Sequence, residues 1–133
     1  MFTRSMVTSK LGLPETSRAG LGLTGNFNAS TQTADSAQTI SVAKMAGGLY
    51  VRSGQTAGRT DTTDTAVNIL AANPSMDIGD NFILLVSNSA AQILTIAGGT
   101  DVTMGAKTTI AASSMGILVF TKTSATAMTC LIV

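Results

Sequence analysis

The chain has 133 residues, a formal net charge of +1, 44% hydrophobic residues and only 11% charged residues. With one cysteine and no histidine, it has no intrachain disulfide framework and lacks the commonest general base and metal ligand. The few Lys and Arg residues are scattered singly, which argues against nucleic-acid binding. The length suits one domain, and the low fraction of charged residues favours a chain that associates with itself or lies on a larger assembly.

Residues 1–38 are interpreted as an extended N-terminal arm. No sustained helical or alternating period runs through them, and Pro14 and several glycines break any long element. We expect such an arm to become ordered only where it lies on a partner, and a leader without a role is the alternative. Its apolar anchors are spaced by glycine and are Leu11, Leu13, Leu21 and Leu23.

The β domain is predicted to occupy residues 39–133. Alternating apolar residues over Thr39–Met45 predict a first strand. After a glycine pair, Leu49–Ser53 predicts a second strand, with Tyr50 and Arg52 on the face opposite its apolar residues.

A short helix is predicted in the middle of the chain, within residues 53–74. Ala66, Ile69 and Leu70 lie at i, i+3 and i+4, which gives one apolar stripe. Pro74 cannot continue a helix, so the helix is expected to stop before it. The stripe would pack the helix against one end or flank of a sheet.

Two aspartates lie at the start of this predicted helix. Asp61, Thr62 or Thr63 can cap it, and Asp61 and Asp64 place negative charge at the positive end of the helix dipole. Two carboxylates could also perform acid–base chemistry or bind Ca²⁺, but threonines fill the intervening positions and the calcium pattern's final glutamate is absent. We therefore expect a structural role, with Arg59 paired to Asp61 or Asp64.

The rest of the chain is predicted to form further short strands. The first of them is apolar on both faces, which predicts a central, doubly covered strand. Phe82–Ala97 is predicted to be a hairpin, and Gly116 indicates a bulge. These further strands, which follow the two described above, are Phe82–Val86, Gln92–Ala97, Val102–Met104, Thr108–Ala111, Met115–Thr121 and Ala127–Ile132.

The strand spacing predicts a mainly β fold. About eight strands separated by turn residues favour an antiparallel β-sandwich, jelly-roll-like, or a barrel, with one short helix and the extended N-terminal arm. No repeat calls for a solenoid. No apolar run approaches the ~20 residues of a membrane-spanning helix, so no membrane association is expected.

No catalytic constellation is found in the sequence. Serines are plentiful, but no histidine or convincing lysine partner would activate one as a nucleophile. The string Gly-Gln-Thr-Ala-Gly-Arg-Thr lacks the lysine of a phosphate-binding loop. Cys130 lies in an apolar run and is expected to be a small buried hydrophobe. We predict no enzymatic activity, no cofactor and no metal.

Several strings from residue 49 onward stand out together. They are Leu-Tyr-Val-Arg-Ser-Gly, Ala-Gly-Arg-Thr-Asp-Thr-Thr-Asp-Thr-Ala, the stretch Ile69 to Pro74, Gly-Asp-Asn-Phe, and then Leu94-Thr95, Val102-Thr103 and Thr109-Ile110-Ala111. This pattern resembles a module in virion proteins of tailed bacteriophages, small β-rich proteins that act as head decoration or cement proteins. The Arg-Thr-Asp-Thr-Thr-Asp-Thr-Ala string is its most specific part, and the arm carries no matching motif.

The resemblance implies a homotrimer on the outer capsid surface, with no catalytic residues. We therefore expect a decoration protein that binds the major capsid protein and stabilises the virion by bridging neighbouring subunits after assembly in the host cytoplasm. The leucine-bearing arm would contact the capsid. The residues expected to organise the sandwich or the trimer contact are Arg59, Asp61, Asp64, Ile69 and Leu70.

The alternative function is that of a phage tail fibre or receptor-binding module that recognises a host surface glycan. Similar modules occur in fibres. Glycan sites usually use aromatic platforms, and this chain has no tryptophan and one tyrosine. The composition therefore ranks the alternative below capsid decoration.

Overall fold

The computed structural model describes residues 27–133. Within that range the chain forms strands and two short helices, which are named in chain order. They are β1 (Asn28–Gln32), β2 (Thr39–Ile40), α3 (Val42–Met45), β3 (Gly48–Arg52), β4 (Arg59–Thr63), α4 (Ala66–Ala72), β5 (Asn81–Asn88), β6 (Leu94–Ala97), β7 (Val102–Met104), β8 (Thr109–Ile110), β9 (Ser114–Lys122) and β10 (Met128–Ile132).

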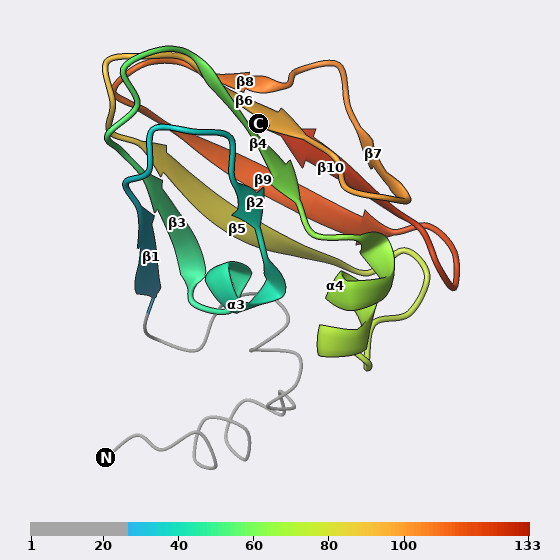
Figure 1. The fold of residues 1–133 in the computed structure, drawn as a ribbon. Helices are drawn as coiled ribbons and strands as arrows, with labels where there is room; N and C mark the ends of the chain where they lie inside the picture. Colours follow the sequence, from blue (N-terminus) through green and yellow to red (C-terminus); the bar gives the residue numbers. More distant parts are fainter. Residues whose placement is uncertain (1–26) are drawn as a thin grey trace, which may run out of the picture.

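Two facing sheets build the fold, which confirms the mainly β prediction. One sheet has six strands in the order β1-β3-β5-β9-β10-β7, and the other has four in the order β2-β4-β6-β8. In Figure 1 the four-stranded sheet lies in front of the six-stranded sheet, and helices α3 and α4 lie together at one end of both.

The strand pairing differs from the predicted antiparallel, jelly-roll-like arrangement. The first six strands alternate between the sheets, so that β1, β3 and β5 pair in parallel in one sheet, and β2, β4 and β6 do so in the other. Antiparallel pairing is confined to β5 with β9, β9 with β10, and β6 with β8. Parallel neighbours need a crossover connection, and here a strand of the opposite sheet provides it. Strand β10 also pairs in parallel with β7, so the antiparallel prediction is wrong for the first six strands and for this pair.

The predicted hairpin over Phe82–Ala97 is also wrong. Strands β5 and β6 lie in different sheets, and β5 pairs along its whole length with β9, from Asn81 opposite Thr121 to Asn88 opposite Ser114. The turn residues after β5 lead the chain across to the other sheet and do not return it beside β5.

The N-terminal part of the domain starts earlier than predicted. Strand β1 lies inside the predicted arm, so the boundary between residues 38 and 39 falls within the folded sheets. The four leucines of the arm lie outside the described residues. The predicted strand Thr39–Met45 is a two-residue strand followed by helix α3, whose first amide, that of Val42, donates to Asp64 Oδ2 at 3.0 Å.

Helix α4 confirms the predicted central helix, with a different start. Ala66 and Ile69 are buried and Leu70 packs against the core. The N-cap is Thr65, whose hydroxyl accepts the Asn68 amide at 3.2 Å, because the preceding residues belong to strand β4. None of the three predicted capping residues therefore caps the helix.

The core lies between the two sheets. The six-stranded sheet contributes Tyr50, Leu84, Leu118 and Phe120, and Phe120 stacks on Phe82 with ring centroids 5.0 Å apart. Gly116 does not form a bulge, since β9 stays in register through it, opposite Val86. A Cβ at this glycine would lie 2.8 Å from Ile110 Cδ1, so glycine allows the two sheets to approach there.

Candidate functional site

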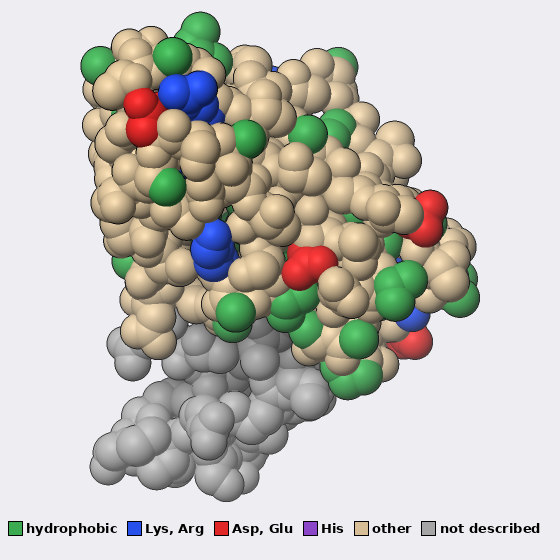
Figure 2. Space-filling view, in the orientation of Figure 1, with side chains coloured by type: hydrophobic (Ala, Val, Ile, Leu, Met, Phe, Trp, Pro, Cys, Tyr) green, Lys and Arg blue, Asp and Glu red, His purple; other side chains and the backbone are tan. Residues whose placement is uncertain are grey.

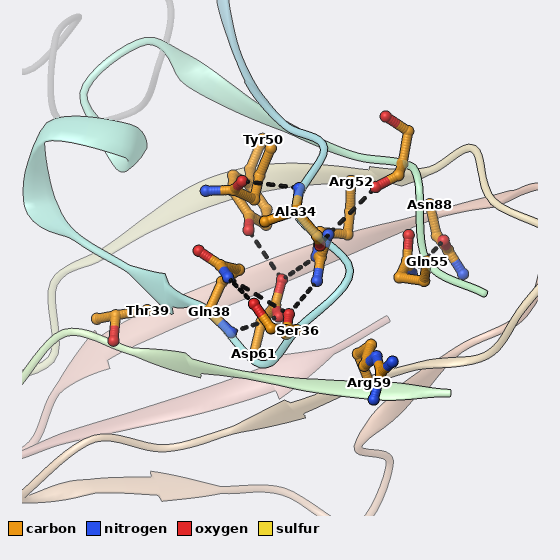
Figure 3. A network of polar contacts seen from close by, with 12 residues as sticks. Ala34, Ser36, Gln38, Thr39, Tyr50, Arg52, Gln55, Arg59, Asp61 and Asn88 are labelled. Atoms are coloured by element: carbon orange, nitrogen blue, oxygen red, sulfur yellow. Dashed lines mark hydrogen bonds and ion pairs between the residues drawn. The ribbon is translucent and has the colours of Figure 1, made fainter. Parts of the chain in front are cut away.

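A buried ion pair joins the two sheets. Arg52 of β3 donates from Nε to Asp61 Oδ2 of β4 at 2.8 Å, and both side chains are 0% exposed. The hydroxyl of Tyr50 donates to the same oxygen at 2.8 Å. Figure 3 shows the three side chains pointing toward one another between the sheets. A charge pair buried in this way is retained only when its remaining polar groups also have partners.

The loop between β1 and β2 supplies those partners. Arg52 Nη1 donates to the Ala34 carbonyl at 2.6 Å, and Nη2 donates to the Ser36 carbonyl. Asp61 Oδ1 accepts the Gln38 amide at 3.1 Å. One ion pair therefore fixes three segments, namely β3, β4 and the loop that precedes β2 (Figure 3).

Arg59 does not pair with Asp61 or Asp64, so that expectation is wrong. Its guanidinium contacts Asp35 Oδ1, with Nη2 at 2.9 Å and Nε at 3.0 Å, and both side chains are partly exposed. The sequence favoured a local partner because it placed these residues on a helix. In the strand that forms instead, Asp61 points inward to Arg52.

Asp64 belongs to a third, separate network that joins the two helices. It accepts the Val42 amide of α3, the Thr65 amide at 2.8 Å and Asn68 Nδ2 at 2.7 Å. Burial works to raise the pKa of this carboxyl, but these hydrogen bonds hold it below its usual value. The structure thus distributes the predicted charged residues over three networks, while Ile69 and Leu70 pack in the core.

The Asp35 carboxylate also binds Thr56, whose hydroxyl and amide both donate to it, the amide at 3.0 Å. These bonds, together with that from Arg59, lower the pKa of Asp35 from 3.8 to about 2. A depressed pKa means that the carboxylate contributes stability above the unfolded-state value and loses it as the pH falls through the folded-state value. The contact between this loop and Thr56 should therefore weaken between pH 3.8 and about 2.

We expect the substitution Thr56→Val to raise the titration midpoint of Asp35 from about 2 toward 3.8, because it removes the hydroxyl donor that depresses the pKa most. The midpoint can be followed by carboxyl carbon NMR. Thr60→Val changes an exposed residue of β4 and should leave the midpoint unchanged. An unchanged midpoint in the Thr56 variant would show that the Thr56 hydroxyl is not what lowers the pKa of Asp35.

Asn88 forms a second buried polar junction, at the end of β5. Its Nδ2 donates to the carbonyls of Gln92, Ile110 and Ala111 at 2.7, 3.2 and 3.0 Å, and its Oδ1 accepts from Gln55 Nε2 at 3.3 Å. Asn88 is 0% exposed. Its hydrogen bonds join the end of β5 in the six-stranded sheet to the loop before β6 and to the end of β8 in the four-stranded sheet.

The outward side of the six-stranded sheet is mostly apolar, with Ser87, Thr121 and Thr129 among its outward positions. Register places Leu85 between Leu49 and Ile117, and Val119 between Ile83 and Leu131. The exposed fractions of Met115, Ile117, Leu131 and Val133 are 57, 37, 49 and 65%. We call this surface the outer apolar face; its residues are Leu49, Val51, Ile83, Leu85, Met115, Ile117, Val119, Leu131 and Val133.

The outward side of the four-stranded sheet is instead lined by threonines. Thr60 lies beside Thr95, which lies beside Thr109, and Thr39 lies beside Thr62. Figure 2 shows this side of the molecule, where apolar side chains are sparse in the middle of the view. We call these five residues the threonine face. The two outer surfaces of the molecule therefore differ in polarity.

Metal ligands, membrane-spanning helices and the one cysteine were sought among residues 27–133 as well. Residues 27–133 contain no group of three or more His, Cys, Asp or Glu side chains that could hold a metal ion. None of the helices formed by these residues is long and apolar enough to span a membrane. Cys130 is buried, as predicted, and burial raises the pKa of its thiol to about 12, which leaves it protonated at neutral pH.

Comparisons with protein-family models, with curated proteins and with solved structures found no match to this chain. The resemblance to phage virion modules therefore stays a prediction from the sequence strings quoted above.

Proposed function

We propose that the chain is a structural virion protein, a trimeric head decoration protein that binds the outer surface of a phage capsid and bridges neighbouring copies of the major capsid protein. The observation that carries the proposal is the outer apolar face, since the outward positions of β3, β5, β9 and β10, including the polar residues Ser87, Thr121 and Thr129, carry no charge. Exposed apolar patches of this kind mark interaction surfaces. The sequence resemblance supplies the kind of partner.

The buried networks suit such a role. The Arg52–Asp61 pair and the Asn88 junction fix the two sheets to each other and to the loop before β2. A rigid subunit loses little conformational freedom when it binds. Buried apolar surface contributes about 25 cal/mol per Å², and three linked subunits raise the strength of attachment through their effective concentration.

Purified protein mixed with undecorated shells of its phage should co-sediment with them, and it should raise the temperature at which the shells open. Shell binding is measured by sedimentation and gel densitometry, which also give the copy number. Hundreds of copies per particle indicate a shell protein, whereas a handful indicate a tail component. Failure to bind intact, undecorated shells would reject the proposal.

In this proposal the leucine-bearing arm adds to the capsid contact. Deleting residues 1–26 should lower shell occupancy, while leaving the unfolding midpoint of the β domain unchanged. A longer deletion through residue 38 would also remove β1 and the carbonyls of Ala34 and Ser36 that Arg52 binds, so it is expected to unfold the domain. Unchanged occupancy after the shorter deletion would remove the arm from the mechanism.

A further inference from the structure

We propose that the outer edge of strand β1, the side away from β3, binds residues 20–24 of the same chain as an added antiparallel strand. Strand β1 ends the six-stranded sheet (Figure 1), and none of the strands within residues 27–133 pairs with this side of it. Proteins usually protect such edges by keeping them very short or by placing charges or proline on them. The other edge strands, β2, β7 and β8, have two or three residues. Strand β1 has five, Asn-Ala-Ser-Thr-Gln, with neither charge nor proline.

The backbone of β1 presents alternate residues to its outer edge. The Asn28 amide donates at 3.0 Å to the carbonyl that precedes β3, and the Gln32 carbonyl accepts at 3.0 Å the amide that follows β3. Both residues therefore bond toward β3. Because the backbone groups of successive residues in a strand point to opposite sides within the sheet, those of Ala29 and Thr31 point to the outer edge.

The sequence directly before β1 predicts a turn that matches this edge. Gly25-Asn26 is a two-residue hairpin signal, with glycine at the first central position of a type II′ turn. Such a turn pairs Thr24 with Phe27 through two backbone hydrogen bonds, and hydrogen-bonded pairs then recur at every second residue. The next pairs are Gly22 with Ala29 and Gly20 with Thr31. The turn therefore addresses the two residues of β1 whose backbone groups point to the outer edge.

The apolar residues of the added strand would fall on the inner side of the sheet. In the same register Leu21 lies opposite Ser30 and Leu23 opposite Asn28. Ser30 in turn lies beside Tyr50, which is fully buried between the sheets. Ser30 itself is only half-buried, so the core can be extended past β1 by the two leucines. Side-chain alternation and backbone pairing thus favour the same register.

The test follows single amides by NMR hydrogen exchange in the full chain, because an edge strand opens locally before the domain unfolds. In the variant Gly22→Pro the amides of Ala29 and Thr31 should exchange about tenfold faster than in the wild type, since proline removes a backbone donor of the added strand. Gly12→Pro, outside the proposed strand, should leave both amides slow. The Asn28 amide bonds toward β3, so its protection in every variant shows that the sheet is intact.

A disulfide tests the register and the origin of the strand. Leu23 and Asn28 form a non-hydrogen-bonded pair in the proposed register, with Cα atoms about 4.5 Å apart, which a disulfide can span. Leu23→Cys with Asn28→Cys should therefore oxidise within one chain. Leu23→Cys with Ala29→Cys puts the two thiols on opposite faces and should oxidise far more slowly. The native Cys130 is buried and does not compete.

All these measurements use the isolated protein, so the inference does not depend on capsid binding. Leu11 and Leu13 lie outside the proposed strand and keep their place in the proposed capsid contact. Fast exchange of the Ala29 and Thr31 amides in the wild-type chain would overturn the inference, and so would protection that survives Gly22→Pro. Equal oxidation of the two cysteine pairs, or a disulfide that joins two chains on a non-reducing gel, would overturn it as well.

Discussion

Replacing Asp61 with asparagine is expected to lower the free energy of unfolding by about 3–5 kcal/mol, because it leaves a buried guanidinium without its counter-charge. Arg52 and Asp61 are both 0% exposed and their contact is 2.8 Å. Asparagine keeps the size of the side chain, so the loss reports the charge and not a cavity. Urea denaturation, followed by circular dichroism, measures the change.

The matched control is Arg59→Gln, which removes the other ion pair described here, with Asp35. Both partners of that pair are partly exposed, and exposed pairs contribute little, so the unfolding curve should shift far less. Equal shifts in the two variants would show that water reaches the Arg52–Asp61 pair. A second variant, Arg52→Met with Asp61→Leu, should recover part of the loss because it removes both charges together.

The substitution Asn88→Ala is expected to destabilise the domain by about 3 kcal/mol, because a buried carbonyl left without a donor costs about 1–3 kcal/mol. One amide now serves the three carbonyls of Gln92, Ile110 and Ala111. Asn88→Asp should be more harmful at neutral pH, since it directs carboxylate oxygens at the same carbonyls. Urea midpoints and slopes compare the variants.

Asn81→Ala provides the control for this prediction. Asn81 lies at the exposed start of the same strand, whereas Asn88 lies at its buried end. The control should therefore leave the unfolding midpoint close to that of the wild type. If Asn88→Asp proved as stable as the wild type, the three carbonyls would have another source of hydrogen bonds, and the junction would not depend on this side chain.

The positions of most strands could be predicted from the sequence, but their partners could not. The predicted strands at Leu49–Ser53, Val102–Met104 and Met115–Thr121 overlap β3, β7 and β9. Alternation tells which residues share a face, but it does not tell which strand lies beside which. A turn that reverses the chain within one sheet and a turn that carries it to the other sheet use the same residue types, so the parallel crossings were missed.

The buried ion pair was missed for a related reason. The sequence placed Tyr50 and Arg52 on the face opposite Leu49 and Val51, as the structure confirms. Burial patterns usually put the apolar face inside, yet here the face with the arginine is the inner one. One signal in the sequence could have indicated the pair: Arg52 on one strand and Asp61 on the next carry opposite charges.

The alternation of the first six strands between two sheets has a consequence for how the chain reaches its native state. Strand β2 lies between β1 and β3 in the sequence but belongs to the opposite sheet, so neither sheet can be completed while the other is absent. Asn28 pairs with Gly48, and Leu49 with Leu85, and most contacts of the domain join residues that are distant along the chain. Topologies dominated by such contacts fold on the order of milliseconds to seconds. The two layers should therefore be acquired and lost together, in one cooperative step.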